Sequence, residues 1–179
     1  LHNVENYMTA AALTRGLITR DDLVEVARTF GGVPHRIEFV RELDGVKYYN
    51  SSIDSTPTRT EAALSVFDCR PVFILCGRDK HVPFDSLARA LYDRAGGVVV
   101  SGEAMPVIRR ALEAEATRRG SDSLPIAYED DFFAAIDRAR TLARPGSAVV
   151  LSPSCTSFDR FRNFEERGDA FREYVKKLV

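Results

Sequence analysis

The chain has 179 residues, of which 45% are hydrophobic and 28% are charged, and its formal net charge at pH 7 is −1. This composition is typical of a globular protein with one domain, or one domain and a piece of another, and it excludes a disordered or fibrous chain. The charges are scattered, so no nucleic-acid partner is expected, and no apolar run is long enough to predict membrane insertion. We expect a cytoplasmic monomer and, because the chain begins with Leu1, a piece cut from a longer protein.

Two amphipathic helices are predicted near the start of the chain, over residues 3–14 and 21–30, from apolar side chains at helical spacing. The stretch "FGGVPHR" (30–36) then breaks the pattern with paired glycines and a proline. We place a domain boundary near residue 34 on this evidence. Two segments that flank "DG" at 44–45 follow it, and they predict a β-hairpin.

After the hairpin, amphipathic helices alternate with short apolar strands. Helices are expected at 57–67, 84–95, 104–119, 130–143 and 164–178, and strands at 71–77, 97–102, 125–129 and 147–153. This alternation predicts an α/β fold, a Rossmann-like, doubly wound and mostly parallel sheet with helices on both faces. Ligands bind such sheets beyond the carboxyl ends of the strands, so the loops there are the candidate site.

The loop "GRDKHVP" (77–83) follows a buried strand and carries three cationic or ionisable side chains. Lys80 and His81 are expected at the carboxyl edge of the sheet, with Arg78 nearby, where they suit a carboxylate or phosphate. A solvated turn without a ligand explains the same residues equally well, because charged turns are common.

The segment "TSFDRF" (156–161) follows the last predicted strand. Thr156 or Ser157 is expected to cap a short helix, with Asp159 in its first turn. The start of a helix next to a free hydroxyl suits an anion. The alternative, preferred on this motif alone, is a cap that serves only the helix.

Most catalytic signatures are absent. The chain has no G-x-S-x-G elbow, no G-x-G-x-x-G fingerprint and no phosphate-binding G-x-x-x-x-G-K-[ST] loop, so an NAD-binding domain or a nucleotide enzyme complete in this chain is not expected. The three cysteines and three histidines lack metal-ligand spacing, and we assign no metal. The cysteines are expected to be structural thiols in a reducing compartment.

Four segments carry a more specific pattern. They are "HNVEN" (2–6), "FGGVPHRIE" (30–38), "YYNSS" (48–52) with a later threonine, and "LSPSCTSFDRFRNFEERG" (151–168). Together, and in this order, they resemble the C-terminal part of the Mur ligases, enzymes of bacterial peptidoglycan synthesis. The last segment is specific to the branch that adds D-glutamate, whereas the first two are shared more widely.

The resemblance implies an ATP-dependent amide ligase that adds D-glutamate to UDP-N-acetylmuramoyl-L-alanine through an acyl phosphate. It implies that residues 1–34 are the helical tail of the central ATP-binding domain and that 35–179 form the C-terminal domain, which contacts the amino acid and the nucleotide. The phosphate loop and the Mg²⁺ ligands would lie mainly in the missing central domain. No catalytic residue is therefore assigned to this fragment, which is expected to be inactive alone.

Binding residues follow from the motifs of the family. The resemblance assigns D-glutamate to Lys80, Ser157, Phe158, Phe164 and Ser55, and it assigns ATP to Asn6, Arg36 and Ser51. A dicarboxylic amino acid needs a cation and hydrogen-bond donors, which the first group supplies.

The run "YYNSSIDSTPTRT" (48–60) departs from the family pattern. Many members have N-D-S-K-A-T-N there, whereas this chain has Ser51 and Ile53 in place of the Asp and the Lys. Asp54 is expected to compensate through a shifted loop, or else Thr58, Arg59 and Thr60 bind anions at the start of the next helix.

Two other functions stay open. A Mur ligase for lysine or meso-diaminopimelate would show a D-N-P-R-like motif where this chain reads "SGEAMP" (101–106). A non-catalytic α/β ligand-binding module is the alternative from another class, because the chain lacks a phosphate loop.

Overall fold

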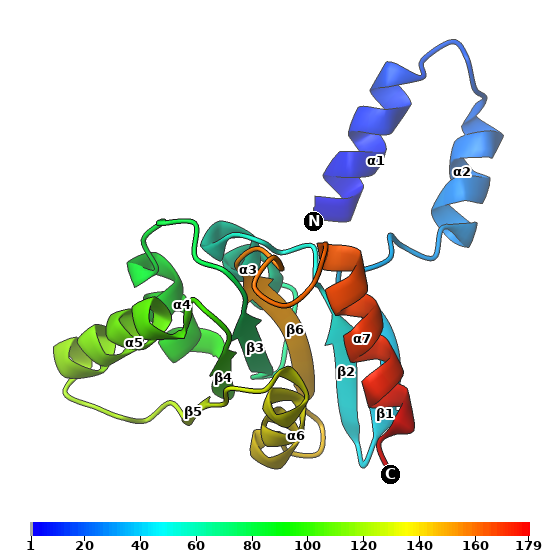
Figure 1. Cartoon of the computed structure of the whole chain (residues 1–179). Helices are drawn as coiled ribbons and strands as arrows, with labels where there is room; N and C mark the ends of the chain where they lie inside the picture. The colour runs from blue at the N-terminus through cyan, green and yellow to red at the C-terminus, as the bar shows by residue number, and fades with distance from the viewer. Residues whose placement is uncertain (1) are drawn as a thin grey trace. The chain divides into compact units, whose positions relative to one another are not determined.

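The computed structural model describes residues 2–179. The chain forms two compact units, and the boundary between them in the sequence lies between Val33 and Pro34. The N-terminal unit contains α1 (His2–Leu13) and α2 (Arg20–Thr29), close to the predicted helices (Figure 1). Thr19 begins α2 through a capping box, because its backbone N–H donates to Asp22 Oδ2 at 2.8 Å and its hydroxyl accepts from the Asp22 backbone N–H at 3.2 Å. The assignment of residues 1–34 to a central domain stays a prediction.

The second unit is an α/β domain built on one six-stranded sheet (Figure 1). Its strands are β1 (Glu38–Leu43), β2 (Val46–Asn50), β3 (Val72–Cys76), β4 (Gly97–Ser101), β5 (Ile126–Tyr128) and β6 (Ala148–Ser154). Its helices are α3 (Pro57–Leu64), α4 (Asp85–Arg94), α5 (Met105–Arg119), α6 (Phe132–Leu142) and α7 (Phe164–Lys177). The order in the sheet is β1-β2-β6-β3-β4-β5, with an antiparallel β1–β2 hairpin and parallel pairs elsewhere. The predicted fold class is confirmed.

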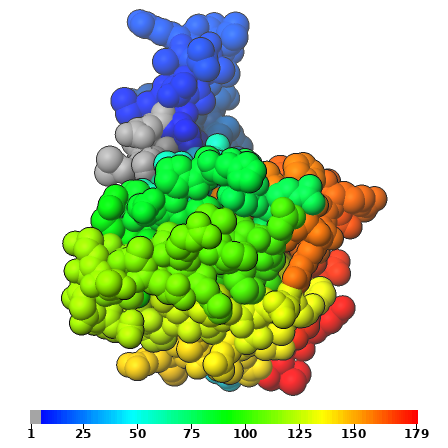
Figure 2. Space-filling model, turned by 60° about the vertical axis from the view of Figure 1, so that its left-hand side comes forward, coloured from blue at the N-terminus to red at the C-terminus, as the bar shows by residue number. Residues whose placement is uncertain are grey.

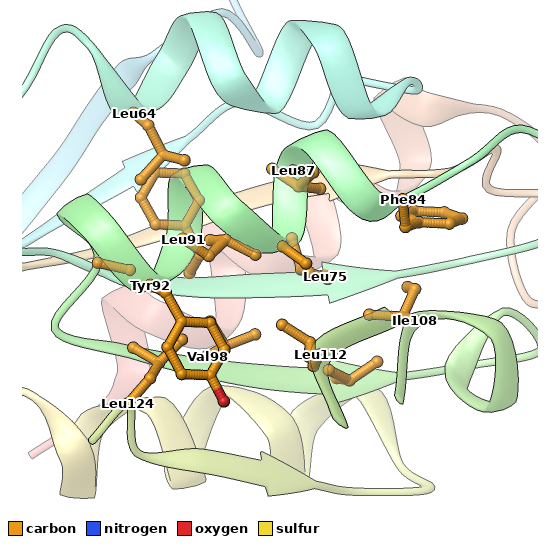
Figure 3. Packing of buried hydrophobic residues seen from close by; sticks show 14 of the residues in the cluster. Leu64, Leu75, Phe84, Leu87, Leu91, Tyr92, Val98, Ile108, Leu112 and Leu124 are labelled. Atoms are coloured by element: carbon orange, nitrogen blue, oxygen red, sulfur yellow. The ribbon is translucent and has the colours of Figure 1, made fainter. Parts of the chain in front are cut away.

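Helices cover both faces of this sheet. Side chains of α3, α4 and α5 form one core with Phe73, Leu75 and Val100, while α6 and α7 form the other with Ile74 and Val149. Figure 3 shows the first core, in which leucines of α4 and α5 lie against β3 and β4. Every residue of β3, β4 and β6 is buried, which explains why these strands read as continuous apolar runs.

One predicted element is wrong. The segment "TSFDRF" forms a single turn, in which the Arg160 and Phe161 backbone N–H groups donate to the Ser157 carbonyl oxygen, and no helix starts there. Thr156 is instead paired with Arg78 in a β-bridge, which keeps it extended. The next helix, α7, begins later, where the Asn163 side chain accepts from the backbone N–H of Glu166 at 2.8 Å.

Within the part of the chain that the structure describes, no helix combines the length and apolar character needed to cross a membrane.

Candidate functional site

The loops after β3 and β6 meet at the point in the sheet where the order of the strands reverses. From β3 the chain continues through β4 to β5, and it then returns through α6 to β6, on the other side of β3. Such a switch point is the usual place for a ligand in an open α/β sheet. The Arg78 backbone N–H donates to the Thr156 carbonyl oxygen at 2.9 Å, and Figure 2 shows the orange segment after β6 beside the green segment after β3.

Gly77 allows this close approach. Its φ is +120°, and a Cβ built on it would lie only 2.0 Å from the Thr156 carbonyl oxygen. Any other residue here would push the two loops apart. The glycine that directly follows β3 is therefore a condition for the site geometry.

Lys80 and Ser55 come together at this edge. Lys80 Nζ lies 3.5 Å from Ser55 Oγ, although the two residues are 25 positions apart in the chain. Lys80 is exposed and Ser55 is half-buried, so a ligand can reach both. In the same loop Arg78 pairs with Glu103 at 3.0 Å and His81 with Asp79 at 3.4 Å. Among the cationic or ionisable side chains of loop 77–83, Lys80 is the one without an ion pair to a described residue.

The remaining residues assigned to D-glutamate lie in or after the loop that follows β6. Ser157 directly follows the Arg78–Thr156 bridge and is 3% exposed, whereas the Phe158 side chain is 58% exposed. Phe164 is the first residue of α7, and its carbonyl oxygen accepts from Ser52 Oγ at 2.8 Å. The structure thus ties Phe164 to the segment after β2, and its ring packs against His35.

Arg167 is a further residue of the site, and the sequence motifs did not indicate it. It is 1% exposed, and its guanidinium donates to the Ser52 carbonyl at 2.9 Å, to Ser52 Oγ at 3.0 Å and to the Cys155 carbonyl at 3.2 Å. One buried cation thereby fastens the ends of β2 and β6 to α7. The signal that could have revealed it is its place four residues before Phe171, on the apolar stripe of a helix where an arginine is out of pattern.

His35 occupies the start of the domain as a buried anchor. Its φ is +63°, its Nδ1 lies 3.0 Å from Asn50 Nδ2, and its ring meets the edge of Phe164. A Cβ at Gly168 would lie 2.2 Å from His35 Nδ1, so only glycine leaves room for the imidazole. His35, the second residue of the second unit, is therefore held in place by these contacts.

Glu38 extends this anchor. Burial raises the pKa of its carboxyl, but the hydrogen bond from the His35 backbone N–H and the interactions with Arg172, 2.9 Å away, outweigh burial, so the net pKa is lowered. Glu38 is thus held as the carboxylate that links β1 to α7.

The three residues assigned to ATP lie in different surroundings. Asn6 is exposed on α1 of the N-terminal unit, and Arg36 is exposed next to His35. Ser51 is fully buried, and its hydroxyl accepts from the Ile37 backbone N–H at 3.1 Å. Asn6 and Arg36 can each meet a ligand as they stand, whereas the Ser51 hydroxyl is already used by the backbone.

Asp54 and Thr60 are both too buried to reach a ligand from outside the domain. Asp54 is 5% exposed and its carboxylate accepts from Ser152 Oγ at 2.9 Å, so the expectation that it reaches a nucleotide is contradicted. Burial raises the pKa of its carboxyl despite hydrogen bonds from Ser51 and Ser152 that lower it. Thr60 is fully buried, which contradicts its expected role as well.

No described residues form a group of three or more His, Cys, Asp or Glu side chains that could hold a metal ion. Cys76 and Cys155 are buried free thiols, and burial raises their pKa to about 11 and about 12, so neither serves as a thiolate nucleophile near neutral pH. An open groove of about 610 Å³ lies between Lys47, Phe67 and Ser147, near the amino ends of the strands, and holds none of the candidate residues.

Comparison with known proteins gives the family. Residues 35–155 match the family described as "Mur ligase, glutamate ligase domain". Among curated relatives, the UDP-N-acetylmuramoylalanine–D-glutamate ligases of Clostridium novyi and Clostridium perfringens are 46% and 43% identical over 99% of this chain. The chain spans 39% of the length of each.

Solved structures agree on the fold. The folylpolyglutamate synthase of Mycobacterium tuberculosis complexed with ADP matches with a TM-score of 0.59 and 18% identity, over 90% of this chain and 36% of that one. The bifunctional folylpolyglutamate synthase/dihydrofolate synthase of Yersinia pestis matches with a TM-score of 0.63 and 11% identity, over 93% of this chain and 37% of that one. These structures show the fold, and the family match over residues 35–155, more than half of the chain, shows that the chain belongs to the Mur ligase family.

Proposed function

We propose that this chain is the amino-acid-binding part of an ATP-dependent ligase that joins D-glutamate to UDP-N-acetylmuramoyl-L-alanine in peptidoglycan synthesis. The relatives that match nearly the whole chain carry that activity in their names. The structural observation that carries the proposal is the approach of Lys80 Nζ to Ser55 Oγ at the switch point of the sheet. An ammonium group and a hydroxyl there suit a carboxylate ligand.

In the proposed site Lys80 binds a side-chain or α-carboxylate of D-glutamate. Ser55 supplies a hydroxyl donor from the loop after β2, and Phe158 offers an exposed apolar ring. Ser157, which is 3% exposed, and Phe164, whose ring packs against His35, keep the D-glutamate assignment that the family motifs give them. Charge-assisted hydrogen bonds of this kind are the strong ones, so Lys80 is expected to contribute most of the affinity.

The proposed reaction proceeds through an activated carboxylate. Transfer of the γ-phosphoryl group of ATP gives an acyl phosphate and ADP, and attack by the amine of D-glutamate then forms the amide, with loss of phosphate and a proton. The part of this chain is to hold the glutamate so that its amino group faces the acyl phosphate, which lowers the entropy cost of the second step.

The proposal includes nucleotide contacts for two of the three residues that were assigned to ATP. Arg36 and Asn6 are exposed groups suited to phosphate and adenine, respectively, whereas Ser51 is fully buried and its hydroxyl already accepts from the Ile37 N–H group and donates to Asp54. The described residues include no cluster of metal ligands, so we assign Mg²⁺ to the remainder of a longer protein and derive no step through it.

We also propose that residues 1–34 end a central ATP-binding domain. α2 contains no buried residue, and Met8, Leu17 and Phe30 are 67%, 83% and 53% exposed. Such a helical pair has too little core to be stable alone. The three free cysteines agree with a cytoplasmic location for the whole protein, which we propose to be a monomer.

The proposal is tested by ADP release from the full-length parent enzyme. UDP-N-acetylmuramoyl-L-alanine is supplied with D-glutamate, L-glutamate, L-lysine or meso-diaminopimelate. Selective turnover with D-glutamate is the expected result. Turnover with another amino acid would keep the family but overturn the assigned specificity, and no turnover with any of the four would favour the ligand-binding module. The 179-residue chain alone is expected to release no ADP.

A further inference from the structure

Four buried polar residues hydrogen-bond to one another, close in the chain to Ser55 and Ser157 of the proposed pocket. They are Asp54, Thr60, Ser152 and Ser154, here called the Asp54 cluster. Each is 5% exposed or less. Ser154 Oγ donates to Thr60 Oγ1 at 2.7 Å, the hydroxyls of Thr60 and Ser152 lie 2.9 Å apart, and Ser152 Oγ donates to Asp54 Oδ2 at 2.9 Å. The cluster joins the loop after β2, the helix α3 and the end of β6.

Asp54 is the acceptor that completes this set. Each hydroxyl has one hydrogen to donate: that of Ser154 goes to Thr60 Oγ1, that of Thr60 goes to the Ser152 carbonyl oxygen at 3.3 Å, and that of Ser152 needs a further acceptor. The Asp54 carboxylate is that acceptor. Without it, the Ser152 hydroxyl would stay buried with one hydrogen-bond acceptor fewer. The backbone of Asp54 takes part as well, because its carbonyl oxygen accepts from the Ser154 N–H at 2.8 Å.

The cluster holds β6 in an unusual conformation at its last residue. Ser154 has a φ of +64°, in the left-handed region that non-glycine residues rarely adopt. The pairing of β6 with β3 shifts register just before it, between Ile74 and Cys76. Such an irregularity re-aims the chain that follows, and here it directs Cys155 to Ser157 toward the loop after β3.

The two ends of the cluster lie next to the two walls of the proposed pocket. Asp54 precedes Ser55, which approaches Lys80, and Ser154 lies three residues before Ser157. A change at Asp54 is therefore expected to move both walls at once, although its own carboxylate is buried and accepts from Ser152 Oγ.

We propose that Asp54 is a positioning residue that sets the distance between Ser55 and Ser157 and so determines how well the pocket fits D-glutamate. This inference rests on the proposed function. It assigns a purpose to Asp54, which lies in the run that departs from the family pattern. Asp54 acts through Ser152 and Ser154 and touches no substrate.

The test uses two substitutions of Asp54 in the full-length parent enzyme. Asp54→Ala removes the acceptor, and we expect the KM for D-glutamate to rise on the order of tenfold or more, with the KM for ATP within about twofold of the parent. Asp54→Asn keeps an acceptor oxygen of the same shape, and we expect it to restore most of the affinity. A KM for D-glutamate that is unchanged in Asp54→Ala, or raised together with that for ATP, would overturn the proposal.

Asp131→Ala serves as the matched control. Asp131 caps α6 by accepting from the backbone N–H groups of Phe133 and Ala134, both at 2.9 Å, so the variant loses stability without touching the pocket. A rise in its KM for D-glutamate would show that general destabilisation, rather than positioning, explains the effect at Asp54. If Asp54→Ala does not fold, Thr60→Val compared with Thr60→Ser repeats the test, and only Val is expected to raise the KM.

A structural measurement separates this proposal from the proposed function. If the parent enzyme shows no turnover with D-glutamate, the proposed function fails, and amide hydrogen exchange on the 179-residue chain then decides the positioning claim. Faster exchange at Ser154 and through residues 155–161 in Asp54→Ala, but not in Asp54→Asn, would support it. Equal exchange in both variants would overturn it.

Discussion

The two sides of the candidate pocket are built differently. The side formed by the loops after β2 and β6 rests on buried hydrogen bonds, with Arg167 and Asp54 at its base. The side formed by the loop after β3 is open, with Lys80 exposed and the His81 side chain 93% exposed. One side therefore maintains geometry and the other supplies charge, so substitutions on the two sides should separate stability from binding.

The largest effect is expected at the base of the buried side. Arg167→Met should lower the free energy of unfolding by about 3 kcal/mol, because the carbonyl groups of Ser52 and Cys155 would stay buried without their donor. Urea denaturation of the 179-residue chain measures this loss. Arg162, with a side chain 87% exposed in the preceding turn, is the control, and Arg162→Ala should leave the midpoint almost unchanged. Similar losses in both variants would remove the distinction between the two sides.

The open side should respond in binding alone. Lys80→Ala in the full-length parent is expected to raise the apparent KM for D-glutamate by about 10- to 100-fold, the contribution of a charge-assisted hydrogen bond, with little change in stability. Steady-state ADP release measures the KM, and thermal unfolding of the same sample measures stability.

Lys47→Ala is the control for charge. Lys47 is also exposed, but it pairs with Ala148 at the opposite end of the strands. If this variant raised the KM as much as Lys80→Ala, net charge would explain the result. An unchanged KM in Lys80→Ala would refute its assigned contact.

The smallest effect is a difference in pH dependence. Burial raises the pKa of Asp54 above its ordinary value of 3.8, so the folded chain holds this proton more tightly than the unfolded chain. The stability that Asp54 contributes is therefore full below pH 3.8 and falls as the pH rises through the raised pKa. Urea unfolding at several pH values should show this fall in the parent chain and a flatter curve in Asp54→Asn.

Glu115, on α5 far from the pocket in sequence, should behave in the opposite way. Hydrogen bonds from Arg118 and Arg119 lower its pKa from 4.5 to about 2, although burial opposes the shift. Its contribution is present above pH 4.5 and is lost as the pH falls toward 2, and Glu115→Gln should remove that loss. The same sign of pH dependence at both residues would contradict the assignment of burial as the cause at Asp54.

Much of the fold follows from local sequence pattern. The period of the apolar residues predicted the helices and strands of the α/β unit, and "DG" predicted the hairpin, because these features depend on neighbours a few positions away. The segment 151–168 carried the family resemblance for a similar reason, since its residues are contiguous. The helix expected at "TSFDRF" failed because Thr156 pairs with Arg78, a residue 78 positions earlier.

The contacts that anchor the site join residues that are far apart in the chain. Asp54 and Ser152 are 98 positions apart, and Arg167 and Ser52 are 115 apart, so no local pattern shows that they share hydrogen bonds. Burial of a polar group is favourable only when a partner is present, and the fold brings each partner from another element. Local pattern thus specified most of the elements, the family and the charge of the pocket, whereas the folded sheet decided which polar residues face a ligand and which ones hold the pocket together.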